Sequence, residues 1–247
     1  YVEILLDPSE TVVSEAGAFM YMSEGIQMET VFGDSKQTGF MNKLFSAGKR
    51  MLTGESLFLT TFTQQGQGKG KAAFAAPYPG KIIPLNLAQH GVMMCQKDSY
   101  LCSALGVDVN IAFTKKFGAG LFGGEGFILQ KLEGDGLAFV HAGGTIAALD
   151  LAPGEHLRVD TGCIVAFQQQ VHYDIQFTGS IKTALFGGEG LFFATLTGPG
   201  RVYLQSLPFS RLAGRIFAAA PQGGGRRRGE GSILGGLGGL LDGDNSL

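Results

Sequence analysis

The sequence predicts an all-β protein made of three tandem antiparallel β modules. Three observations support this: abundant glycine, a two-residue alternation of apolar side chains, and an internal repeat. Glycine fills 40 of the 247 positions, against a usual share of about 7 %. Each glycine inside a helix costs about 1 kcal/mol relative to alanine, whereas turns and bulges use glycine freely. The glycine content therefore argues against a mainly helical fold and favours many short strands.

Residues 107–136 and 171–200 are copies of one supersecondary unit. Aligned without gaps at an offset of 64 residues, they are identical at 13 of 30 positions, where chance matching would give about two to four. The turn LFGGEG is common to both copies, and a weaker third copy, LTGESLFLTTF, covers residues 52–62. The repeat predicts three modules, at about residues 10–75, 82–142 and 145–207.

Alternation defines the strands of each module. In VHYDIQF, Tyr173 and Ile175 fall on one side while His172 and Asp174 fall on the other, as expected of a half-buried strand. A Gly-x-Gly turn is expected at Gly134 and Gly136 and again at Gly198 and Gly200. The strands expected around these turns are 107–113, 127–132, 137–140, 171–177, 191–196 and 202–204, with 26–32 as the first strand of the weaker copy.

A module of this size cannot cover its own apolar face, so the three are expected to pack with pseudo-threefold symmetry. They would form one domain over residues 1–209. A tail rich in Gly, Arg and Leu follows at 210–247, with a basic linker and the run SILGGLGGLL. Four glycines in that run would cost about 4 kcal/mol of helix propensity. We therefore expect the tail to be disordered or held against a partner subunit.

Charge and cysteine usage exclude several classes of protein. The 19 basic and 21 acidic side chains give a net charge of −2, which does not favour nucleic-acid binding. The sequence contains no apolar run of the length that a membrane span needs. The odd set Cys95, Cys102 and Cys163 has no CxxC pair and predicts buried free thiols in the cytoplasm.

The repeated GGEG turn between paired strands, an opening VEILLDPSETVVSEAGAFMYM and a Gly-rich end together resemble the altered-inheritance-of-mitochondria family. The resemblance covers about residues 1–210. It implies a triplicated fold similar to the tryptophan-RNA-binding attenuator protein, a shortened double-stranded β-helix. Fungal members of the family are mitochondrial and affect inner-membrane organisation. No catalytic residues are established for the family, so the resemblance implies none here.

Two groups of polar residues are candidate sites. The repeat carboxylates Glu55, Glu125 and Glu189 could meet near a pseudo-threefold axis and hold a cation or an arginine, since three bare carboxylates would raise one another's pKa. The structural alternative is that each accepts backbone N–H bonds within its own glycine turn. His172 and Asp174, two residues apart on one strand face, have a spacing that could chelate a metal, although solvent-facing polarity explains them equally well.

No motif for nucleophilic catalysis or phosphate binding is present, since GxSxG, GxxxxGK[ST] and the cupin pattern GxxxxxHxH are all missing. The sequence therefore predicts a non-enzymatic assembly or scaffolding protein that forms a homo-oligomer and holds no metal or cofactor. One alternative is a small-molecule or nucleic-acid binding module that uses clefts between modules. Another is a metal enzyme of cupin type.

Overall fold

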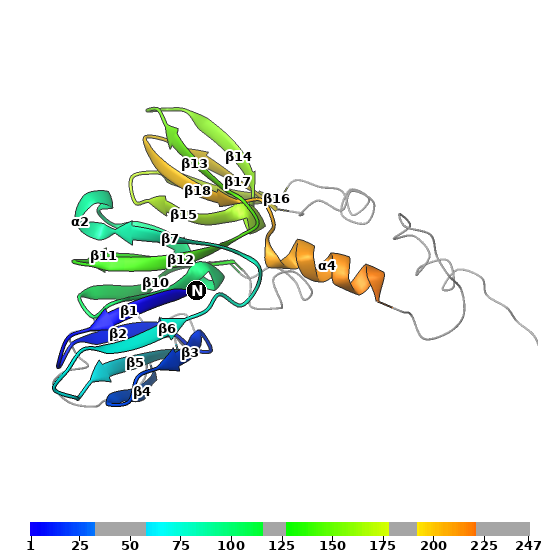
Figure 1. Cartoon of the computed structure of the whole chain (residues 1–247). Coiled ribbons are helices and arrows are strands. Elements are labelled where there is room, and N and C mark those ends of the chain that lie inside the picture. Colours follow the sequence, from blue (N-terminus) through cyan, green and yellow to red (C-terminus); the bar gives the residue numbers. More distant parts are fainter. Residues whose placement is uncertain (33–57, 116–126, 178–191, 221–247) are drawn as a thin grey trace, which may run out of the picture.

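The computed structural model describes residues 1–32, 58–115, 127–177 and 192–220 (Figure 1). Strands dominate this part of the chain, and every strand ladder in it is antiparallel. The predicted all-β class is confirmed. In the described part of the chain, no helix combines the length and the apolar character that a membrane span requires.

In the described residues, the strands fall into three successive groups of six. The first group is β1 (Val2–Leu6), β2 (Thr11–Glu15), β3 (Phe19–Met22), β4 (Ile26–Phe32), β5 (Phe58–Gln64) and β6 (Gly70–Phe74). Within it, β6 lies between β1 and β3, and β5 lies between β4 and β2. This group starts upstream of residue 10, because β1 pairs with β6.

The second group repeats this pairing. It consists of β7 (Gly80–Asn86), β8 (Met93–Gln96), β9 (Tyr100–Ala104), β10 (Val107–Lys115), β11 (Phe127–Gly134) and β12 (Leu137–Gly143), with the short helix α2 (Leu87–His90) after β7. Strand β12 lies between β7 and β9, and β11 lies between β10 and β8. The expected turn between β11 and β12 is present, and Gly134 and Gly136 adopt φ of 120° and 129°, which side chains disfavour.

The third group follows the same scheme. It consists of β13 (Ile146–Leu151), β14 (His156–Asp160), β15 (Ile164–Gln168), β16 (His172–Phe177), β17 (Phe192–Thr197) and β18 (Gly200–Gln205). Strand β18 lies between β13 and β15, and β17 lies between β14 and β16. The strands expected from alternation all occur, with ends that differ by a few residues. Packing of the modules about a single pseudo-threefold axis stays a prediction.

Two ladders join the groups into larger sheets. The second strand of the first group pairs with the third strand of the second group, β2 with β9, and β8 pairs with β15 in the same way. The results are two six-stranded sheets, β4-β5-β2-β9-β12-β7 and β10-β11-β8-β15-β18-β13. Two three-stranded sheets remain, β1-β6-β3 and β14-β17-β16, and Figure 1 shows them toward opposite ends of the molecule.

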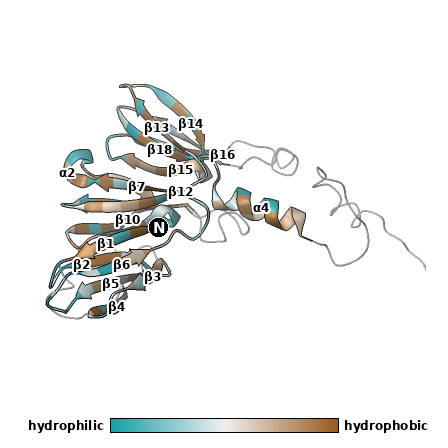
Figure 2. Cartoon of the chain, in the orientation of Figure 1, coloured by the Kyte–Doolittle hydropathy of each residue, from teal (hydrophilic) through white to brown (hydrophobic). Residues whose placement is uncertain are grey.

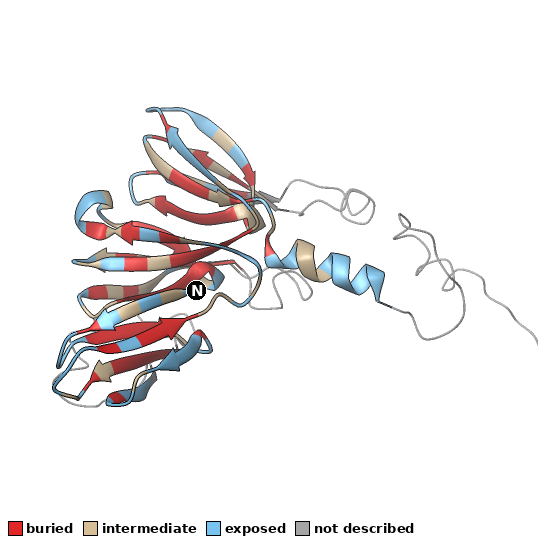
Figure 3. Cartoon of the chain, in the orientation of Figure 1, coloured by how far each residue is buried: buried red, intermediate tan, exposed pale blue. Residues whose placement is uncertain are grey.

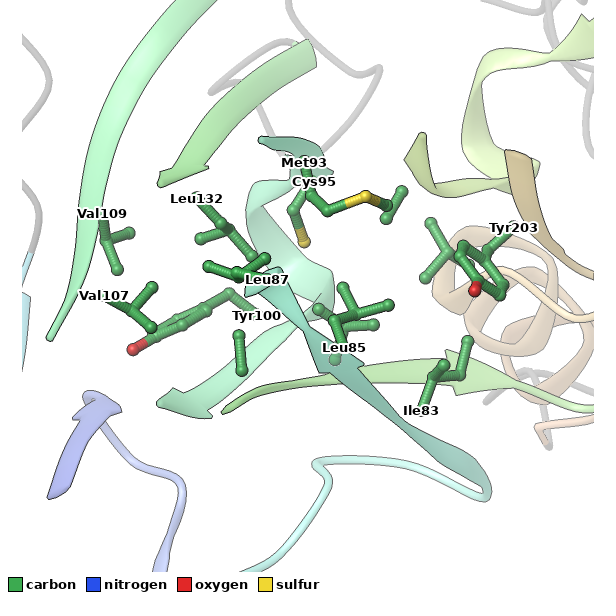
Figure 4. Packing of buried hydrophobic residues seen from close by; sticks show 14 of the residues in the cluster. Ile83, Leu85, Leu87, Met93, Cys95, Tyr100, Val107, Val109, Leu132 and Tyr203 are labelled. Atoms are coloured by element: carbon green, nitrogen blue, oxygen red, sulfur yellow. The ribbon is translucent and has the colours of Figure 1, made fainter. Parts of the chain in front are cut away.

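Apolar side chains from the alternating strands form three buried clusters, which Figure 3 shows as red bands along the strands. The central cluster brings Leu85, Met93 and Leu132 together between the two large sheets (Figure 4). In the first group, the ring of Phe62 stacks on Phe19 and meets Phe74 edge-on. Burial of this kind contributes about 25 cal/mol per Å² and is the main stabilising term of such a fold.

The start of the predicted tail differs from expectation. Residues 209–219 form helix α4 (Phe209–Ala219), which extends away from the sheets (Figure 1). The tail was expected to be disordered or held against a partner subunit, and disorder does not apply to this stretch, because the costly glycine run lies further on, outside the described residues; contact with a partner stays a prediction. Figure 2 shows apolar residues along α4, and Phe209, Ile216 and Phe217 are exposed.

Candidate functional site: two open sheet edges

The predicted site residues are only partly within the described chain. Glu55, Glu125 and Glu189 lie outside the described residues. His172 and Asp174 lie on β16, exposed and on one face as the alternation predicted, opposite Thr197 and Thr195 of β17. Within the described ranges, no group of three or more His, Cys, Asp and Glu side chains could hold a metal ion.

The three cysteines are free thiols, and two of them are fully enclosed. Cys95 and Cys102 lie in the central strands of the two large sheets. Burial raises the pKa of the Cys102 thiol to about 12, and it raises the pKa of Cys95 as well. Because the thiolate is the reactive form, both groups are inert at neutral pH.

The repeated strand pairing identifies a more informative feature, at the second and third strands of each group. In the interior of the chain these strands pair across groups, β2 with β9 and β8 with β15. Strand β3 is a third strand and β14 is a second strand, and each has a single ladder neighbour in the described residues, β6 and β17 respectively. These two edges are therefore the positions at which the repeated pairing is incomplete.

Exposure shows the consequence for β3. Its four residues, Phe19, Met20, Tyr21 and Met22, are large and apolar, and each is 37–51 % exposed. At the matching third strands, residues 100–103 of β9 and 164–167 of β15 are at most 3 % exposed. Edge strands in monomeric proteins normally carry charges or prolines that discourage pairing. Strand β3 carries neither a charge nor a proline. Its apolar composition is that of the buried strands β9 and β15, but its side chains are exposed.

Strand β14 shows the complementary difference. The second strands β2 and β8 are buried over their first four residues, whereas β14 has the alternating pattern of a partly exposed edge. Only Val159 is buried among its residues, with Leu157 partly so. His156 and Arg158 point to solvent on the intervening positions. Strand β14 is thus a second open edge, apolar on one face and polar on the other.

Polar contacts fix both edges in place. Tyr21 donates a hydrogen bond to Glu3 on β1, and Lys71 on β6 pairs with the same carboxylate at 2.9 Å. The Tyr21 bond, and then the Lys71 contact, lower the pKa of Glu3. At the end of β14, Arg211 of α4 binds Asp160 at 2.8 Å, and Asp160 also accepts the Gly162 N–H. Each edge is therefore held extended before any partner binds.

An open hollow lies beside β3, between the first and second groups. Tyr1 and Met20 line it from the first group, and Lys81 and His141 line it from β7 and β12. Tyr78, in the connection between β6 and β7, meets the His141 ring edge-on at 4.4 Å. Burial lowers the pKa of His141, so the ring is neutral at pH 7. The hollow combines apolar walls with the exposed ammonium of Lys81.

Sequence reasoning passed over β3. The run FMYM has no alternation, so periodicity gave no reason to place it in a sheet. Four consecutive large apolar residues between the glycines of GAFMYMSEG would have been the available signal. That signal cannot distinguish a buried strand from an uncovered edge, because the difference depends on which strand lies beside it.

Comparisons with known proteins agree with this architecture. The family model described as Mitochondrial biogenesis AIM24 matches residues 1–207. An uncharacterized protein of Streptococcus pyogenes serotype M6 is 28 % identical over 221 residues, which is 89 % of this chain and 86 % of that protein. An X-ray crystal structure of a Streptococcus pyogenes protein, from the Northeast Structural Genomics Consortium, is similar with a TM-score of 0.68 at 25 % identity. It covers 88 % of this chain and 93 % of the solved one.

Proposed function

The chain belongs to the AIM24 family, and from this premise we propose that it is a non-enzymatic assembly protein that forms a homo-oligomer through its open sheet edges. The relative from serotype M6 is itself uncharacterized, so the proposal is argued from this chain's own geometry. The observation that carries it is the contrast between β3, with four exposed apolar residues, and the buried strands β9 and β15 at the same position of the repeat.

Energetics favour this use of β3. An unpaired edge with apolar side chains presents free N–H and C=O groups together with surface that water solvates poorly. Covering such an edge satisfies the backbone groups and removes apolar area from water, at about 25 cal/mol per Å². Lysine at the same positions would keep the edge solvated, because burying an unpaired ammonium costs several kcal/mol.

Mass measurements test the proposal. We expect the wild-type chain to show species heavier than its 26.0 kDa monomer in mass photometry and light scattering. The double variant Met20→Lys with Met22→Lys is expected to shift these species to the monomer, with at least a tenfold weaker self-association. Met28→Lys is the matched control, since Met28 is also exposed and lies on β4, a fourth strand that is a sheet edge like its counterparts. A wild-type monomer at micromolar concentration would refute the proposal.

A small-molecule binding role is the second candidate, and the hollow beside β3 favours it. Its apolar walls and the Lys81 ammonium suit an amphiphilic carboxylate, because the cation would pair with the acid while the tail covers Met20 and Tyr78. Native mass spectrometry of the purified chain would then show a co-purified mass that is reduced in Lys81→Ala. An unliganded mass in both proteins would count against this role.

A further inference from the structure

We propose that the partner of β3 is β14 of a second copy of this chain, added as an antiparallel strand. This inference rests on the proposed function and names the surface that completes it. The joined sheet would run β16-β17-β14 from one copy and β3-β6-β1 from the next. That is the order fourth, fifth, second, third, sixth and first strand, the same order that both observed six-stranded sheets have.

Strands β3 and β14 are chosen because the other sheet edges occur at the same position in every group. The first strands β1, β7 and β13 are sheet edges in all three groups, and so are the fourth strands β4, β10 and β16. An edge that is open in every group is a feature of the six-stranded group and gives no sign of a missing partner. Within the described part of the chain, β3 and β14 are open, although their counterparts in the other groups are paired. Each of these two edges is therefore one half of a joint that the chain already makes twice.

The repeat also determines which residue of β14 is equivalent to those of the observed joints. Ser14, Cys95 and Val159 pair with Thr60, Gln130 and Ala194 of their fifth strands. Each of those partners stands five positions after the glutamate of its repeat, at Glu55, Glu125 and Glu189 respectively. Val159 is therefore the counterpart of Ser14 and Cys95.

A β-bulge aligns the third strands. In all three groups, the ladder between the third and sixth strands has one register shift. On the third strand, the shift lies between Phe19 and Tyr21 in β3, between Tyr100 and Cys102 in β9, and between Ile164 and Ala166 in β15. The residues after the bulge are thus equivalent, and two of them pair across groups, Cys102 with Ser14 and Ala166 with Cys95. A conserved position for the bulge sets the register, because a one-residue slip would turn every side chain to the other face.

These equivalences give the register of the new joint. Val159 of one copy lies opposite Tyr21 of the other, Arg158 lies opposite Met22, and Leu157 lies opposite Ser23. On one face the apolar Val159 and Leu157 meet β3, and on the other the aliphatic stem of Arg158 covers Met22 while its guanidinium reaches water. The joint then covers part of the apolar surface that β3 exposes in the single chain.

The joint is head-to-tail, because it uses different surfaces of the two copies. After the first contact, one copy still has a free β3 and the other still has a free β14, so assembly continues until a ring closes or a filament forms. This is a different outcome from a two-fold dimer, in which the same surface of both copies would meet.

Cysteine cross-linking tests the partner and the register. In chains that also carry Cys163→Ala, Arg158→Cys is introduced into one preparation and Met22→Cys into another, and the two are mixed, allowed to exchange and oxidised. Both positions are exposed in the single chain. Directly opposite Cα atoms of an antiparallel pair lie about 4.5–5.5 Å apart, within the range that a disulfide spans. Met28→Cys replaces Met22→Cys in the control mixture.

We expect a covalent dimer in the Arg158→Cys and Met22→Cys mixture, with at least a fivefold lower yield in the control mixture and in each preparation alone. If mass photometry shows oligomers but this covalent dimer does not form, the β14–β3 joint is refuted, while the proposed homo-oligomer still stands. A monomer without cross-links would refute both the joint and the proposed function. A third preparation carries both Arg158→Cys and Met22→Cys in one chain. A disulfide at monomer mass in this preparation would show that the two edges of one chain pair with each other, and it would overturn the inference.

Discussion

Replacing Phe167 by alanine is expected to lower the free energy of unfolding by about 3–5 kcal/mol, the usual cost of emptying a buried aromatic site. Phe167 is fully buried on β15, near the centre of a six-stranded sheet. It pairs with Met94 on one side and Val202 on the other, and its ring lies 5.4 Å from the ring of Tyr173. The cavity would therefore open at the joint between the second and third groups, where backbone ladders on both sides prevent collapse.

Thermal and denaturant unfolding measure this effect. For a chain of this length, 1 kcal/mol corresponds to about 2–4 °C, so Tm should fall by roughly 6–20 °C. Phe217→Ala is the matched control, because Phe217 is 73 % exposed on α4, and it should change stability by less than about 0.5 kcal/mol. A loss below about 1 kcal/mol for Phe167→Ala would contradict the packing described for β15.

Gly143→Ala is expected to destabilise the fold by about 3 kcal/mol or to prevent folding. A Cβ at residue 143 would stand 2.1 Å from the Leu207 carbonyl oxygen and 2.8 Å from the Tyr78 ring. Tyr78 precedes β7, Gly143 ends β12, and Leu207 follows β18, so the connections that leave the three groups meet at this point. Overpacking in a core usually costs about 1–3 kcal/mol, and here the colliding atom is backbone and cannot turn aside.

Gly68→Ala is the control for this substitution. The same methyl group at residue 68 would have no heavy atom within 4 Å, and the replacement should leave Tm within about 2 °C. Circular dichroism and urea unfolding of both variants compare the two sites directly. Equal stability of Gly143→Ala and Gly68→Ala would show that the three connections do not meet as closely as described.

Local sequence features were sufficient to predict seven of the strands in the described residues. The alternation in VDVNIAF and VHYDIQF identified β10 and β16, and the paired glycines at 134 and 136 identified the turn that follows β11. Both signals act over a few residues, because side chains alternate along any strand and glycine alone tolerates the φ values of such turns. The helix α4 was missed, since its apolar spacing was not separated from the glycine-rich run that follows it.

The candidate site could not be predicted in the same way. The residues that the sequence favoured, Glu55, Glu125 and Glu189, were chosen for repetition and charge, and His172 and Asp174 for their spacing. The open edges were not favoured, because neither FMYM nor HLRVD matches a catalytic, metal-binding or phosphate-binding motif. What makes Tyr21 and Val159 significant is the comparison with Cys102 and Ser14, which requires the observed ladders.

The amino-acid sequence by itself determined the fold class and the positions of the strands next to the Gly-x-Gly turns, because period and glycine placement are properties of neighbouring residues. Only the tertiary structure decided that β2 joins β9 and β8 joins β15, while β3 and β14 each have a single ladder neighbour among the described residues. Strand pairing depends on which backbones lie within hydrogen-bonding distance, and Val13 and Ser103, which face each other, are far apart in the chain. Which strands of the described residues are joined and which are edges is therefore a property of the folded molecule.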